Sequence, residues 1–166
     1  MALRTIRQSG DPLLRKISKP VRKFDSKMND LLDDMIETLK SVNGLGLAAP
    51  QVGALKRAIV VNINDVLYEI INPEILESRG SQNSKEGCLS VAGKNGYVRR
   101  PEYLKIKARD RNGDEYVIEG EGLLATALSH EIDHLDGILY IDKAIEVWDA
   151  TDEDGWEDEN GEEGSQ

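Results

Sequence analysis

The sequence predicts an α+β fold in which antiparallel β-sheets surround a central helix, with a second helix near the N-terminus. Apolar residues recur at three- and four-residue steps in two separate segments, which is the pattern of amphipathic helices. Between these segments lie β-branched runs that join in pairs across short turns, which is the pattern of antiparallel hairpins. The order helix, strands, helix therefore favours α+β over a parallel α/β sheet.

The N-terminal helix is expected to begin at about residue 25. Asp25 or Ser26 can cap its first turn, and Gly44 is the expected stop. The preceding segments Asp11-Pro12-Leu13-Leu14-Arg15 and Lys19-Pro20-Val21 are expected to lie along the surface between turns. One apolar stripe defines the buried face of the helix: Met28, Leu31, Leu32, Met35, Ile36, Leu39 and Val42.

Two hairpins and the central helix follow. The first hairpin is expected over residues 57–63 and 66–72, with Asn64-Asp65 at its turn. The second is expected over residues 104–111 and 115–118, turning at Asn112-Gly113, a strong short hairpin signal. Residues 86–90, between the hairpins, are expected to form a loop or a short strand. The central helix is expected from about Glu121 to Leu135, ending at Gly137.

The central helix carries the sequence His130-Glu131-Ile132-Asp133-His134, which fits the HExxH pattern. Residues four apart share one face of a helix, so both imidazoles can reach one divalent ion. Glu131 lies beside the expected metal and is suited to take a proton from a metal-activated water. The chain has only two histidines, and both fall inside the match. These residues predict a metal-dependent hydrolase.

A third ligand is needed, because a catalytic site usually has three protein ligands and an open position. The extended pattern HExxHxxGxxH is followed as far as Gly137, but Tyr140 stands where its third histidine belongs. Glu146 is one candidate in its place. Cys88, the one cysteine in the chain, is the favoured candidate. A Cys/His/His set suits zinc or ferrous iron, and the pattern does not choose between them.

Three sequence blocks together resemble peptide deformylase, the family that removes the formyl group from the N-terminal formyl-methionine of newly made polypeptides. The blocks are Gly44-Leu45-Gly46-Leu47-Ala48-Ala49-Pro50-Gln51, then Glu86-Gly87-Cys88-Leu89-Ser90, then His130-Glu131-Ile132-Asp133-His134. Each block alone is moderately specific, whereas three in this order are highly specific. The likeness covers roughly residues 3–142 and includes the segment from Asp11 to Arg15.

The resemblance implies a role for each site residue. Cys88, His130 and His134 would bind one divalent ion, with Fe²⁺ as the native metal and Zn²⁺ or Ni²⁺ as substitutes. Glu131 would be the general acid/base, and the Gln51 amide and the Leu89 backbone N–H would stabilise the oxyanion. The substrate-binding residues would be Gly46, which pairs with the peptide backbone, Arg100, which positions the peptide, and Leu45, Gly87, Thr126 and Ala127.

The charge of the chain is unevenly distributed. The formal net charge is -10, yet residues 149–166 contain nine acidic and no basic residues, so the rest is nearly neutral. We therefore expect a single catalytic domain over residues 1–148 and an acidic, disordered tail over 149–166. Such a tail argues against direct nucleic-acid binding. It also argues against ribosome docking through a basic C-terminal helix, which some family members carry.

The features that the sequence lacks predict the cellular compartment and the partners of the protein. No apolar run reaches the roughly 20 residues of a membrane span, and the N-terminus has no apolar signal segment. One cysteine cannot form an internal disulfide. We therefore expect a cytoplasmic monomer that acts on formyl-methionyl nascent peptides without entering a membrane. Two alternatives stay open: a zinc endopeptidase, and a catalytically inactive homologue that only binds peptides.

Overall fold

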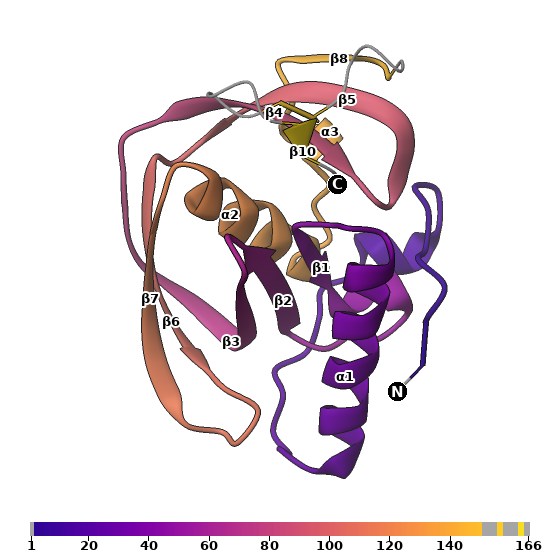
Figure 1. The fold of residues 1–166 in the computed structure, drawn as a ribbon, viewed down its shortest axis with the longest axis vertical. Coiled ribbons are helices and arrows are strands. Elements are labelled where there is room, and N and C mark those ends of the chain that lie inside the picture. The colour runs from indigo at the N-terminus through magenta and orange to yellow at the C-terminus, as the bar shows by residue number, and fades with distance from the viewer. Residues whose placement is uncertain (1, 151–155, 158–162, 165–166) are drawn as a thin grey trace.

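The computed structural model describes residues 2–150, 156–157 and 163–164. A five-stranded and a three-stranded antiparallel sheet pack around helix α2 (Leu123–Leu135), while helix α1 (Ser26–Ser41) covers the other face of the larger sheet (Figure 1). This arrangement confirms the predicted α+β class, the central helix and the N-terminal helix. None of the described helices is long and apolar enough to cross a membrane.

The larger sheet has the order β1-β2-β3-β6-β7 and the smaller one the order β4-β5-β8. Their strands are β1 (Gly46–Ala48), β2 (Ala58–Ile63), β3 (Val66–Arg79), β4 (Gln82–Cys88), β5 (Val91–Arg100), β6 (Tyr103–Arg109), β7 (Glu115–Glu121) and β8 (Glu146–Asp149). The short elements are η1 (Pro12–Arg15), η2 (Ala49–Val52), α3 (Tyr140–Lys143) and the paired strands β9 (Trp156–Glu157) and β10 (Glu163–Gly164).

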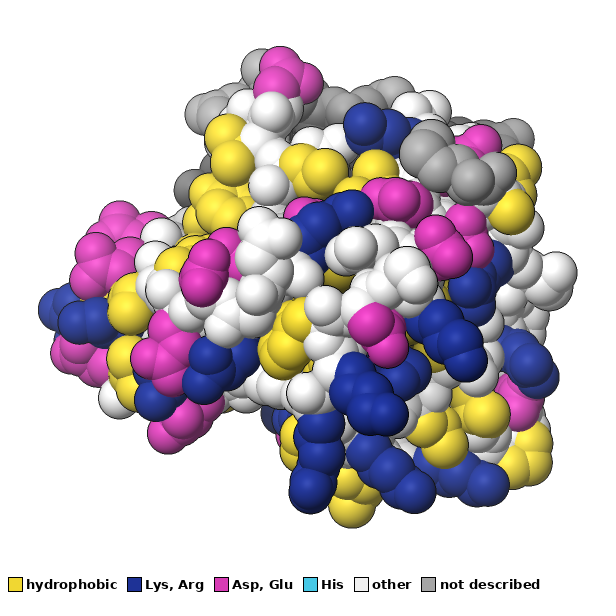
Figure 2. All heavy atoms as spheres, turned by 90° about the horizontal axis from the view of Figure 1, so that it is seen from below, with side chains coloured by type: hydrophobic (Ala, Val, Ile, Leu, Met, Phe, Trp, Pro, Cys, Tyr) yellow, Lys and Arg dark blue, Asp and Glu magenta, His cyan; other side chains and the backbone are white. Residues whose placement is uncertain are grey.

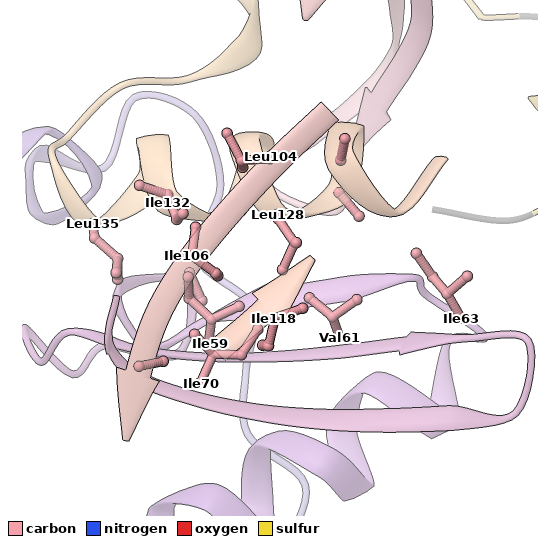
Figure 3. Close-up of a cluster of buried hydrophobic side chains, with 14 residues drawn as sticks. Ile59, Val61, Ile63, Ile70, Leu104, Ile106, Ile118, Leu128, Ile132 and Leu135 are labelled. Carbon is pink, nitrogen blue, oxygen red and sulfur yellow. The ribbon is translucent and has the colours of Figure 1, made fainter. Parts of the chain in front are cut away.

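Strand β2 shows why a helix packs on each side of the sheet. Successive side chains of a strand point to opposite faces, and here both faces are apolar. Ile59 and Val61 pack against α2, whereas Ala58 and Val60 pack against α1, and all four are fully buried. Figure 3 shows the first cluster, in which side chains of the sheet point toward those of α2. The buried apolar side chains of the larger sheet therefore hold helix α2 in place through packing contacts.

Both predicted hairpins are confirmed. Asn64 and Asp65 have positive φ angles of 54° and 62°, as a two-residue hairpin turn requires, and they join β2 to β3. The second hairpin turns over residues 110–114 and joins β6 to β7. Strand β3 continues to Arg79, well past the predicted end, because a register shift after Ile71 lets it go on pairing with β6.

Residues 86–100 differ most from the expectation. The predicted loop or short strand at 86–90 is the end of the seven-residue strand β4, and β5 follows after a tight turn. Glycines made β5 hard to recognise, yet one of them has a packing reason. An added Cβ at Gly96 would lie 2.8 Å from the carbonyl oxygen of Glu146, so only glycine lets β8 approach this closely.

The predicted stop of the first helix is also corrected. Asp25 caps α1 as expected, since its carboxylate accepts the Met28 N–H at 3.1 Å. At the other end Asn43, with φ of 52°, takes the left-handed conformation instead of Gly44. The Gly44 N–H then donates to the Leu39 carbonyl at 3.2 Å. In α2, by contrast, Gly137 has φ of 75° and ends the helix as predicted.

The acidic tail begins within ordered structure. Asp149 belongs to β8 and pairs with Lys94 of β5, and the Ala150 N–H donates to the Gly93 carbonyl at 2.8 Å. Residues 149 and 150 thus pair with strand β5, and the division into a catalytic domain and a tail at residue 148 stays a prediction. The backbones of β9 and β10 pair with each other. The rest of the tail, and with it the prediction of disorder there, lies outside the described residues.

Candidate metal centre and active site

Helix α2 and the end of β4 bring three potential metal ligands together. Ligand atoms of Cys88, His130 and His134 lie within 4.8 Å of one another, and all three residues are buried. The Cys88 Sγ lies 3.3 Å from the His134 Nε2, and the centroids of the two imidazole rings lie 5.1 Å apart. One thiol and two imidazoles form a donor set suited to zinc or ferrous iron. The cluster can therefore hold one metal ion.

The charges around the cluster also fit a cation. Burial lowers the pKa of His134 well below its ordinary value, which keeps this side chain in the neutral form that binds metals. Burial also disfavours a charged His130, but the nearby Glu131 carboxylate and the hydrogen bonds of His130 with Cys88 and Glu86 outweigh it and raise the pKa of His130. The ionised Glu86 carboxylate, 2.8 Å from the His130 Nδ1, would favour a divalent cation bound to the two imidazoles.

Glu86 orients one of the two histidines. Its Oε1 lies 2.8 Å from the His130 Nδ1, so His130 presents Nε2 to the cluster. Burial alone would raise the pKa of Glu86, but hydrogen bonds from Arg100 and His130 prevail and lower it to about 2. A carboxylate behind a ligating histidine is the usual support of a metal site. Glu86 was not predicted to have this role, although it begins the second motif block.

Arg100 supports the site from behind and does not reach the substrate side. Its Nε and Nη2 donate to the two Glu86 oxygens, each at 2.8 Å, and its Nη1 donates to Asp133 at 2.8 Å. The Arg100 and Glu86 side chains are each only 1% exposed. The guanidinium is thus committed to two carboxylates inside the protein, and Arg100 is not among the residues that line the small pocket, so any effect of Arg100 on the peptide would pass through Glu86 and Asp133.

Glu131 lies beside the cluster and faces strand β1. An added Cβ at Gly46 would lie 2.6 Å from the Glu131 Oε2, so the carboxylate occupies the space left by this glycine. Among the described residues its buried Oε1 has no hydrogen-bond partner. Burial raises the pKa of Glu131 to about 7, and the weaker influence of His130 opposes this. A carboxyl group with such a pKa can both accept and return a proton near neutral pH.

Gln51 is held with its amide nitrogen toward the cluster. Its Oε1 accepts the Ala48 N–H at 2.9 Å, and its Nε2 donates to the Ser90 Oγ at 3.0 Å and lies 3.7 Å from the Cys88 Sγ. Ser90 was not a predicted site residue, although it ends the second motif block. Leu89 lies in the turn directly after Cys88, and its carbonyl accepts from Gln8 at 2.9 Å.

A small pocket opens beside the histidines. Four of the predicted substrate-binding residues line it: Leu45, Gly46, Thr126 and Ala127. The other lining residues are Leu123 and three residues of the site, Glu86, His130 and Glu131. Gly87 is not among these residues and lies buried within β4. The pocket holds about 20 Å³, which is room for about one water molecule. A larger side chain could enter only if the pocket widened.

The fold and this cluster define a class: metal-dependent hydrolases that carry HExxH on a buried helix. Comparison with known proteins then identifies the family, because residues 3–148 match the family model of polypeptide deformylase. The chain belongs to this family, and its activity is therefore the hydrolysis of N-formyl groups from N-terminal formyl-methionine. This confirms the main functional prediction and supports neither the endopeptidase nor the inactive homologue.

Individual peptide deformylases are similar to this chain over most of its length. The chain is 54% identical to the peptide deformylase of Acetivibrio thermocellus, over 90% of this chain and 88% of that protein. The corresponding protein of Caldicellulosiruptor bescii is 56% identical over 87% of each chain. Among solved structures, the Thermotoga maritima peptide deformylase has a TM-score of 0.86 at 39% identity, covering 88% of this chain and 100% of that one. The Ehrlichia chaffeensis enzyme in complex with actinonin has a TM-score of 0.84 at 39% identity, covering 86% and 89%.

Proposed function

We propose that this chain deformylates formyl-methionyl peptides with Glu131 as general acid/base and with Cys88, His130 and His134 as the ligands of one divalent ion. The observation that carries the proposal is the position of Glu131, a buried carboxylate between the ligand cluster and the small pocket, whose Oε1 has no hydrogen-bond partner among the described residues. When bound, the ion would supply a Lewis acid that polarises the formyl oxygen and lowers the pKa of water. The rest of the chemistry comes from side chains of the protein.

Glu131 moves the proton. Its carboxylate takes the proton that the attacking water loses and returns it to the nitrogen of the departing amine, so the C–N bond breaks and formate is released. With a pKa raised to about 7 by burial, Glu131 can perform both steps near neutral pH. The donors for the developing oxyanion would be the Gln51 Nε2, which the Ala48 and Ser90 contacts hold in place, and the Leu89 backbone N–H.

The substrate would bind along β1. This strand forms one edge of the larger sheet, and an extended peptide can add to such an edge through backbone hydrogen bonds. Gly46 leaves room there for both the peptide and Glu131. Leu45, Thr126 and Ala127 would then surround the methionine side chain after the pocket has widened. We assign no substrate contact to Arg100.

The finer assignments rest on the resemblance and on the donor set. We propose Fe²⁺ as the native ion, with Zn²⁺ or Ni²⁺ as active substitutes, because a thiolate with two imidazoles accepts all three. Formylated nascent chains arise where proteins are synthesised, so we propose a cytoplasmic enzyme that works as a monomer.

Substitution of the cysteine tests the ligand set. Cys88→Ala is expected to lose the bound metal and to stop releasing formate from a formyl-methionyl tripeptide under anaerobic conditions. A matched control is Ser84→Ala, a buried position on the same strand that lies outside the ligand cluster. The control should retain one metal per chain. A Cys88→Ala protein that kept its metal and cleaved internal peptide bonds would instead support a zinc endopeptidase.

A further inference from the structure

A groove lined with cations lies at the end of the molecule where α1 begins. Five exposed basic side chains line it, and we call it the basic groove: Lys19, Arg22, Lys23, Lys27 and Lys56. Its volume is about 740 Å³, and its remaining walls come mostly from apolar side chains. Figure 2 looks at this end and shows Lys and Arg side chains gathered on it. The groove is separate from the ligand cluster, with which it shares no residue.

Among the described residues, the cations of the basic groove have no ion-pair partner, unlike most of the other Lys and Arg side chains. All 21 Lys and Arg residues lie within residues 2–150, which the structure describes, and eleven of them form ion pairs there. None of the five groove cations is among those eleven. The one acidic side chain in the groove, Asp25, already accepts the Met28 N–H as the cap of α1. Strong positive charge therefore persists here although the chain as a whole is acidic.

The groove is built on a rigid support. The Lys19 N–H donates to the Leu55 carbonyl and the Arg57 N–H donates to the Lys19 carbonyl, both at 3.0 Å, which ties the two cationic segments together. Two residues further on, the Asn72 side chain exchanges hydrogen bonds with the Val21 backbone at 2.8 and 2.9 Å. Cations fixed to a sheet lose little backbone freedom when they bind, so this surface is organised in advance for an anionic partner.

We propose that the basic groove binds the phosphate backbone of RNA. Five exposed Lys and Arg side chains around one groove, none of them in an ion pair among the described residues, favour a partner that presents several negative charges, as a phosphate backbone does. This inference rests on the proposed function: the substrate is a nascent peptide, which is held on the ribosome, so RNA is the polyanion present where deformylation takes place. The acidic tail is a less fitting occupant, because β8 and its described strands β9 and β10 lie at the end of the view in Figure 1 opposite to the start of α1.

Binding of a fluorescent single-stranded RNA oligonucleotide to the full chain tests the proposal. Five phosphate contacts predict that affinity falls about 50-fold between 0.1 and 0.3 M salt, from a slope of roughly -0.7 per contact. Lys23→Glu combined with Lys56→Glu should weaken binding more than tenfold. The matched control, Lys40→Glu combined with Lys105→Glu, changes the net charge equally at two cations that also lack ion-pair partners but lie outside the groove. It should retain most of the affinity.

The outcomes separate this inference from the proposed function. Both double variants should release formate from a free formyl-methionyl tripeptide at the wild-type rate, because neither touches the active site. Absence of RNA binding, or equal weakening by both double variants, would overturn the inference while leaving the proposed function intact. Preferential binding of a poly-glutamate peptide through the same residues would show that the groove takes acidic protein segments, which also overturns it. Failure to release formate from the free peptide would count against the proposed function alone.

Discussion

Replacing Arg100 by leucine is expected to destabilise the protein strongly without weakening peptide binding. The Arg100 and Glu86 side chains are each 1% exposed, and the Arg100 guanidinium makes two hydrogen bonds of 2.8 Å to Glu86. Removing the arginine leaves a buried carboxylate without its main partner. Breaking a buried pair in this way costs about 3–5 kcal/mol. For a domain of this size, that corresponds to a fall in Tm of roughly 6–20 °C.

The matched control is an arginine whose ion pair is exposed. Arg79 pairs with Glu77, and the two side chains are 64% and 47% exposed. Arg79→Leu should therefore cost about 1 kcal/mol or less. Chemical denaturation of the metal-free proteins measures both free energies of unfolding, and the KM for a formyl-methionyl peptide is measured on the metal-loaded proteins. Arg100→Leu should leave this KM unchanged, since the side chain does not line the pocket.

A double variant distinguishes loss of the pair from loss of packing. Arg100→Leu together with Glu86→Leu removes both charges, so it should recover part of the stability lost by the single variant. Because His130 then loses the Glu86 carboxylate, metal affinity should still fall about 10- to 100-fold. The reasoning would be refuted if Arg100→Leu cost less than about 1 kcal/mol, or if it raised the KM while leaving stability unchanged.

Three further outcomes follow. Gly46→Ala should lower kcat/KM with little change in Tm, because the new methyl group would meet the Glu131 carboxylate 2.6 Å away; full activity would contradict this. Gly137→Ala should destabilise more than Gly93→Ala in chemical denaturation: both have positive φ, but only at Gly137 would the Cβ meet a backbone oxygen, that of Arg15, at 2.5 Å. Equal costs would refute that contact. The iron-loaded enzyme should lose formate-releasing activity in air while the nickel and zinc forms persist, because ferrous iron beside a thiolate is prone to oxidation; equal decay of all three would contradict it.

Local patterns were enough to predict the regular elements. The apolar stripe of α1 and the turns at Asn64-Asp65 and Asn112-Gly113 involve residues close in sequence. The structure confirms both turns and the stripe as far as Leu39, whereas Val42 was wrongly included, because it follows the last residue of the helix and is exposed. Strand β5 could not be predicted in the same way. Its glycines weaken the strand pattern, and the reason for Gly96 is the close approach of β8, some fifty residues later in the chain. Such a cause is visible only after the chain has folded.

The residues of the site also fall into two groups: those that local sequence patterns predict and those that only the folded structure brings together. HExxH places His130 and His134 on one helical face by local geometry alone, whereas Cys88 joins them only through the packing of β4 against α2. Arg100 shows the limit of a motif alignment: adjacency to a motif does not reveal whether a side chain turns inward. Its inward direction follows from its alternation with exposed Arg99 along β5 and from the buried acids that receive it.

The distribution of charge over the surface was the feature that the sequence predicted least well. The count of charged residues along the sequence shows that the excess of acidic residues lies in residues 149–166. It does not show that five basic residues gather in one groove of the folded domain. Lys56 follows the other four groove cations by about thirty residues and reaches them only because the segment around Lys19 lies against residues 55–57. The expectation that the chain does not bind nucleic acid came from the tail alone, and the RNA experiment described above now tests it.

The proposed mechanism of deformylation depends most directly on the role of Glu131. Anaerobic formate release from a formyl-methionyl tripeptide, normalised to bound metal, should be compared between the wild type and Glu131→Ala. The variant should keep one metal per chain, because Glu131 is not a ligand, yet lose about 10²- to 10⁴-fold in kcat, as expected when a general acid/base is removed. A Glu131→Ala protein that keeps its metal and releases formate at the wild-type rate would contradict the proposed mechanism.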